Sequence, residues 1–79
     1  MMELEIITPE KELFRGEVSS VKFPGTSGGF EILNNHAPII STLNKGEIKV
    51  TTNNKNTKEF EINGGVIEMQ NNKIIVLAD

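Results

Sequence analysis

Branching at Cβ dominates the apolar residues of this chain. Ile and Val together number fifteen, whereas Leu and Ala together number seven, of which two are Ala. Branched side chains suit a pleated strand and lose rotamer freedom in a helix, and the scattered Gly and Asn are also poor helix formers. No stretch shows a 3.6-residue apolar period long enough for a helix. The sequence therefore predicts an all-β fold.

Short apolar segments separated by turn signals at intervals of roughly 8–12 residues are typical of a sandwich or barrel. The expected strands lie around positions 3–8, 17–23, 30–33, 39–43, 48–50, 59–62, 66–69 and 74–77. The apolar phase slips between Val18 and Val21, which predicts a bulge near Ser19 and Ser20. Asn71 and Asn72 predict a two-residue turn, because Asn tolerates positive φ. The apolar run at 74–77 is interpreted as a strand buried on both faces.

Length and charge limit what the chain can be. Seventy-nine residues form one domain, 1–79, with a small core. The absence of Cys favours a reducing compartment or its neighbour, and the N-terminus does not resemble a signal peptide. No apolar run approaches the roughly 20 residues of a membrane span. The net charge of −3, with acids and bases interleaved, gives no reason to expect binding to nucleic acid or insertion into a membrane.

Catalysis by this chain alone is not expected. His36 is the single histidine, and the serines that could act as nucleophiles lie outside any elbow motif. One His and scattered Glu residues have no metal-ligand spacing, so neither a metal nor a cofactor is predicted. His36 is either a hydrogen-bonded residue that fixes its loop or a contact residue at a protein interface. Phe30 is either part of the core or an exposed anchor.

Several segments of the chain occur together in a known family. Positions 24–25 are Pro-Gly, and positions 28–38 are Gly-Gly-Phe-Glu-Ile-Leu-Asn-Asn-His-Ala-Pro. They are flanked by Ile-Ile-Thr-Pro at 6–9, Phe-Arg-Gly-Glu-Val at 14–18, Gly-Glu-Ile at 46–48, Gly-Gly-Val-Ile-Glu-Met at 64–69 and Val-Leu-Ala-Asp at 76–79. In this order and spacing they resemble the epsilon subunit of F-type ATP synthases, called delta in mitochondria. The resemblance covers essentially the whole chain.

The resemblance implies a small two-sheet β-sandwich of about ten short strands. It also implies a non-catalytic central-stalk subunit that links the gamma subunit to the membrane c-ring, so that proton or sodium flow is coupled to ATP synthesis. Its expected place is peripheral, on the cytoplasmic face of the bacterial plasma membrane. Most members continue into a two-helix hairpin that restrains ATP hydrolysis. This chain stops at Asp79, so a natural short form that does not inhibit by that route is expected.

Contact residues follow from the same resemblance, position by position. The c-ring side is expected to contain Gly28, Gly29, Phe30, Glu31 and Ile32. The gamma side is expected to contain Thr8, His36 and Ser41.

Two alternatives from other classes remain open at this point. One is a free-standing small β module, such as a lipoyl-type carrier or a ligand-binding sandwich, because Lys73 follows a tight turn and Lys55 lies in an Asn-rich tip. The other is an enzyme that uses His36.

Overall fold

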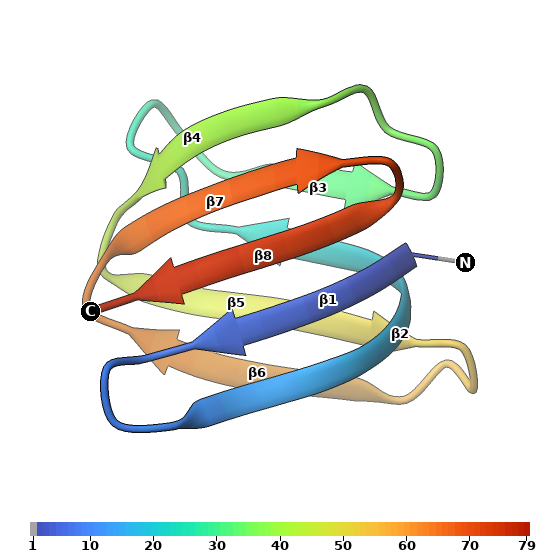
Figure 1. The fold of residues 1–79 in the computed structure, drawn as a ribbon, viewed down its shortest axis with the longest axis horizontal. Coiled ribbons are helices and arrows are strands. Elements are labelled where there is room, and N and C mark those ends of the chain that lie inside the picture. Colours follow the sequence, from blue (N-terminus) through green and yellow to red (C-terminus); the bar gives the residue numbers. More distant parts are fainter. Residues whose placement is uncertain (1) are drawn as a thin grey trace.

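Eight β-strands and their connecting turns make up residues 2–79, the part of the chain that the computed structural model describes (Figure 1). The strands are β1 (Met2–Ile7), β2 (Glu12–Phe23), β3 (Phe30–Leu33), β4 (Ile39–Leu43), β5 (Gly46–Thr52), β6 (Thr57–Ile62), β7 (Gly65–Gln70) and β8 (Lys73–Ala78). The described residues contain no helix, and therefore none that could cross a membrane. The all-β prediction is confirmed.

Two layers share the long strand β2. The first half of β2 pairs with β1, and β1 continues through β8 and β7 to β4. The second half of β2 pairs with β3 on one side and with β5 on the other, and β5 pairs with β6. Figure 1 shows β2 curling from the front layer, where β1, β8, β7 and β4 lie, to the layer behind. The result is a sandwich with one continuous hydrogen-bonded path.

The predicted bulge lies where β2 changes layers. The register between β2 and β5 slips between Val18 and Ser20, as the apolar pattern indicates. Ser19 Oγ donates to the carbonyl oxygen of Thr51 at 3.1 Å and so fastens the irregular segment to β5. A bulge bends a strand and increases its twist, which lets one strand serve both sheets.

The eight strands roughly match the resemblance, which implies about ten. The strand expected at 17–23 begins earlier, at Glu12, because Gly16 continues the pairing of β2 opposite Leu4. A glycine within a strand can allow a close approach of neighbouring groups without ending the ladder. Here a Cβ on Gly16 would lie 3.4 Å from the Phe14 ring.

The core lies between the two layers and is apolar throughout. Its buried side chains alternate with outward-facing ones along each strand, as for Leu4 and Ile6 on β1. Within residues 2–79 no polar or charged residue is fully buried. The predicted Asn71-Asn72 turn is confirmed, with φ values of 54° and 61° that match the type I′ geometry of a two-residue hairpin.

Candidate functional site

The last strand, β8, is buried on one face only. Ile74 and Val76 are fully buried, whereas Leu77 is 57% exposed and Ile75 is half-buried. The prediction that positions 74–77 are buried on both faces is therefore wrong. The outer face of this layer carries apolar side chains that no other part of the described chain covers.

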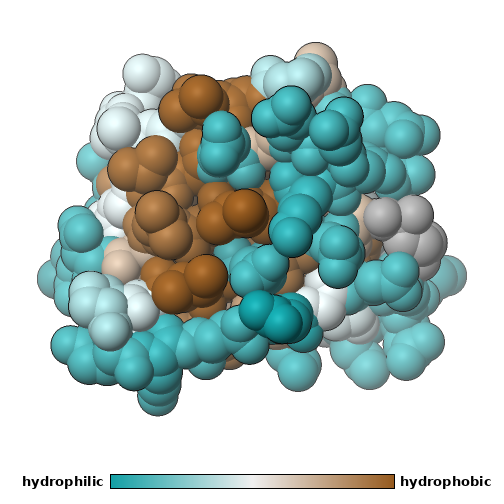
Figure 2. All heavy atoms as spheres, in the orientation of Figure 1, coloured by the Kyte–Doolittle hydropathy of each residue, from teal (hydrophilic) through white to brown (hydrophobic). Residues whose placement is uncertain are grey.

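Val66, Leu77 and Ile7 form an unbroken apolar row across three strands, while Ile40 and Ile75 lie in the next row on either side of the exposed Glu68. In the pairing register, Val66 on β7 and Ile7 on β1 lie on either side of Leu77. Ile40 on β4, 74% exposed, lies one row away on the far side of β7. We call Ile7, Ile40, Val66, Ile75 and Leu77 the apolar patch. Figure 2 shows hydrophobic residues gathered on the left half of this face. A contiguous patch, unlike single exposed residues, marks an interaction surface.

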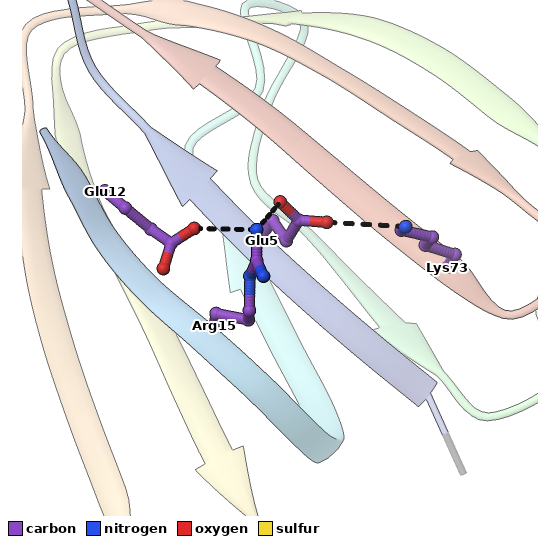
Figure 3. Close-up of polar contacts among 4 residues, drawn as sticks. All are labelled: Glu5, Glu12, Arg15 and Lys73. Atoms are coloured by element: carbon purple, nitrogen blue, oxygen red, sulfur yellow. Dashed lines mark hydrogen bonds and ion pairs between the residues drawn. The ribbon is translucent and has the colours of Figure 1, made fainter.

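Charged residues border the apolar patch on the β1 and β2 side. Glu5 lies beside Ile75 in the register, and its side chain is 16% exposed. Its two oxygens pair with Arg15 at 3.2 Å and with Lys73 at 3.4 Å, and Arg15 also pairs with Glu12 at 3.1 Å (Figure 3). Each pair near the surface contributes little to stability on its own. Together the four residues give the patch a fixed polar border.

The outer face of the second sheet is charged instead. Glu31 on β3 lies opposite Lys22 on β2, which lies opposite Lys49 on β5. Lys49 forms a 3.8 Å ion pair with Glu59 on β6. Leu33 is exposed on this face as well, at 54%, but its nearest register neighbour is the polar Ser20. The two outer faces of the sandwich thus differ sharply in polarity.

Three of the residues expected at the c-ring are exposed. Gly28 and Gly29 lie in the turn between β2 and β3, and Glu31 points outward from β3. Gly28 has φ +120°, a conformation that favours glycine, and nothing lies within 4 Å of where its Cβ would be. The turn therefore projects backbone rather than side chains.

The other two residues of that group face inward. Phe30 is half-buried, and its ring lies 5.5 Å from that of Phe23. It also covers Gly25, where a Cβ would lie 2.7 Å from the Phe30 ring. Ile32 is fully buried in the core. The side chain of Ile32 cannot reach a partner, and Phe30 supports the turn from below as part of the core boundary.

The three residues expected at the gamma subunit do not form one cluster. The strands β1 and β4 run in the same direction, because β1 is parallel to β8 and two antiparallel pairings follow. Thr8 follows the end of β1 and His36 precedes the start of β4, so they lie at opposite ends of the sandwich (Figure 1). Ser41 is half-buried in the middle of β4, on the same side as the buried Ile67.

Thr8 and His36 each form hydrogen bonds within their own turn or loop. Thr8 holds the β1–β2 turn, since its N–H and its Oγ1 both donate to the carbonyl oxygen of Lys11, at 2.8 and 3.0 Å. His36 is exposed, and its Nδ1 lies 2.7 Å from the carbonyl oxygen of Ala37. A carbonyl oxygen only accepts, so Nδ1 carries a proton. His36 thus fixes its own loop while its ring stays open to a partner.

Sequence reasoning missed the exposed apolar residues Ile40, Val66 and Leu77. The signal was the pairing of apolar neighbours at 39–40, at 66–67 and within 74–77. Successive side chains in a strand point to opposite faces, so each doublet places one apolar side chain outside. Within residues 2–79, no group of His, Asp and Glu is arranged to hold a metal ion.

The comparison with known families identifies the type of this β-sandwich. The sequence profile described as "ATP synthase, Delta/Epsilon chain, beta-sandwich domain" matches residues 1–79. The chain belongs to this family. An ATP synthase epsilon chain of Chlorobium limicola is 40% identical over 77 residues, which cover 98% of this chain and 88% of that one. Family membership does not favour a free-standing carrier or ligand-binding module.

Solved structures agree on the fold of this delta/epsilon-type domain. A chain in the Euglena gracilis mitochondrial ATP synthase structure of OSCP, F1 and c-ring superposes with a TM-score of 0.91 at 15% identity, covering 98% of this chain and 49% of that chain. A chain in the Tetrahymena thermophila mitochondrial ATP synthase central stalk and c-ring structure gives 0.80 at 23% identity, with 98% and 62% covered. The domain thus spans about half to two thirds of these two chains.

Proposed function

We propose that this domain is a non-catalytic central-stalk subunit of an F-type ATP synthase. It binds the gamma subunit and the c-ring, so that ion-driven rotation of the ring reaches the catalytic head. The observation that carries the proposal is an exposed apolar patch on one face of a well-packed sandwich whose sequence matches the delta/epsilon family throughout. Permanently assembled subunits bury such surfaces. In this proposal the domain acts by binding, and within residues 2–79 no group of His, Asp and Glu is arranged to hold a metal ion.

The gamma subunit is the proposed occupant of the apolar patch. Two of the expected gamma contacts adjoin it in the chain, because Thr8 follows Ile7 and Ser41 follows Ile40. His36 extends the surface along β4 toward the other end of the sandwich. An elongated partner that crosses the front layer would reach all three, although they do not cluster. The half-buried Ser41 lies on β4 next to the segment where residues 24–26 pair with that strand, so a partner would reach it from the start of β4.

The c-ring is the proposed partner of the β2–β3 turn. Gly28 and Gly29 offer backbone groups without side-chain bulk, and Glu31 offers a carboxylate on the charged outer face. These groups suit polar loops, whose donors can pair with exposed acceptors. Phe30 and Ile32 hold the turn and strand in place from the core.

The proposed location is peripheral, at the cytoplasmic face of the bacterial plasma membrane, where the stalk meets the ring. Reconstitution tests the role. Catalytic head lacking this subunit should bind ring-containing vesicles and pump ions on ATP addition only after the 79-residue chain is added. Full pumping without the chain would overturn the proposal.

A further inference from the structure

The side chain of Asn72 joins the β7–β8 hairpin to the loop between β3 and β4, which is distant in sequence. Its Oδ1 accepts a hydrogen bond from the backbone N–H of Asn35 at 2.8 Å. Its Nδ2 donates to Oδ1 of Asn34 at 2.7 Å. Among residues 2–79, these two bonds are the hydrogen bonds that tie the loop 34–38 to the β7–β8 hairpin. We call this pair of bonds the Asn72 clasp.

The backbone that carries the clasp is itself held on two sides. Asn72 occupies the second position of the type I′ turn between β7 and β8, with φ 61°. Its carbonyl oxygen accepts from the N–H of Glu3 at 3.0 Å, which fixes the turn to the start of β1. The amide therefore projects from a rigid point toward the loop.

The loop needs such support because its own bonds are short-range. Asn35 has φ 66°, and the N–H of His36 donates to the carbonyl oxygen of Leu33 at 3.1 Å. Residues 34–38 are all exposed, so little packing restrains them. A loop ordered only by local bonds pays conformational entropy when a partner binds, and a preformed loop avoids that penalty.

We infer that Asn72 is a positioning residue for the gamma surface: its clasp on Asn34 and Asn35 preforms the loop that presents His36. The inference rests on the proposed function, because it takes His36 as a gamma contact. The φ requirement of the turn does not by itself explain the side-chain hydrogen bonds of Asn72. Its neighbour Asn71 has the same residue type and a similar φ of 54°, yet no side-chain hydrogen bond of Asn71 occurs within residues 2–79.

The neighbouring Asn residues supply a matched pair of variants. Glycine is favoured at both positions of a type I′ turn, so Asn72→Gly removes the clasp and keeps the turn, while Asn71→Gly makes the same change without touching the clasp. Two readouts apply: hydrogen exchange at the Asn35 amide in the free chain, and affinity for the gamma subunit of the same organism. Thermal melts check that both variants fold alike.

Asn72→Gly should speed exchange at Asn35 and weaken gamma binding about 5- to 10-fold, the loss expected for one or two hydrogen bonds. Asn71→Gly should leave both readouts within about twofold. Asn72→Asp keeps the acceptor for Asn35 and should lie between them. Equal gamma affinity in the two glycine variants would overturn the inference and leave the proposed function standing. A wild-type chain that fails to bind gamma would overturn the proposed function, and the positioning role with it, even if the Asn35 amide is protected.

Discussion

Leu77 on β8 and Val66 on β7 lie directly opposite each other in the antiparallel pair, and both side chains point away from the core. Ile7 continues the same row on β1. Three strands therefore present an apolar row on the outside of a sandwich that already has a filled interior. Such a row is stabilised by a covering partner rather than by water.

Leu77→Glu should separate assembly from folding. The side chain is largely exposed in the free domain, so the melting temperature should change little. A carboxylate buried without a partner at an interface should reduce gamma affinity by about 100-fold or more. Leu33→Glu is the matched control, because Leu33 is equally exposed but lies on the charged outer face. Calorimetric titration measures the affinity of both variants for gamma. Comparable losses of affinity in the two variants would contradict the assignment of the patch.

Substitution of Phe30 should affect stability, whereas substitution of its neighbour Glu31 should affect c-ring binding. Phe30→Ala removes a ring packed on Phe23 and on the core, and should lower the free energy of unfolding by about 2–3 kcal/mol. Glu31→Ala should leave stability within about 0.5 kcal/mol while it weakens binding to c-ring vesicles. Urea unfolding and vesicle sedimentation give the two quantities. A stable Phe30→Ala domain that had lost ring binding would instead make Phe30 a direct contact.

Two of the three glycines with large positive φ, Gly65 and Gly28, should tolerate alanine very differently. At Gly65, φ is +155° and a Cβ would clash with the carbonyl oxygen of Leu77. Gly65→Ala must move β8 and should destabilise the fold by at least about 3 kcal/mol. At Gly28, φ is +120° but the space is open, so Gly28→Ala should cost about 1 kcal/mol. Thermal melts of the two variants test the order, and equal melting temperatures would refute it.

Local chemistry made much of this fold predictable from sequence. The strand at 30–33, the bulge after Val18 and the Asn71-Asn72 turn depend on nearby residues, and all three agree with the structure. The exposed face of β8 did not follow from sequence, because an apolar run does not say whether a second layer covers it. The separation of Thr8 from His36 was also hidden, since it depends on the directions of β1 and β4 in the assembled sheet.

The ion-pair border of the patch should respond to salt. Glu5→Gln keeps the shape of the side chain but removes the charge that pairs with Arg15 and Lys73. The free energy of unfolding should fall by about 0.5–1 kcal/mol at low ionic strength, and this loss should shrink in 1 M salt as screening increases. The control is Glu59→Gln, whose single 3.8 Å pair is well exposed on both sides and should contribute less. A loss at Glu5 that does not depend on salt would point to packing rather than charge.

The most direct test of the stalk role is the mass of the species formed when the purified chain is mixed with its organism's gamma subunit, measured by native mass spectrometry. The proposed function predicts a one-to-one complex at micromolar concentrations, abolished by Leu77→Glu and retained by Leu33→Glu. The absence of any complex, with both partners shown to be folded, would contradict it. In that case a lysine-modified mass of the chain from native cells would be the sign of a free-standing carrier.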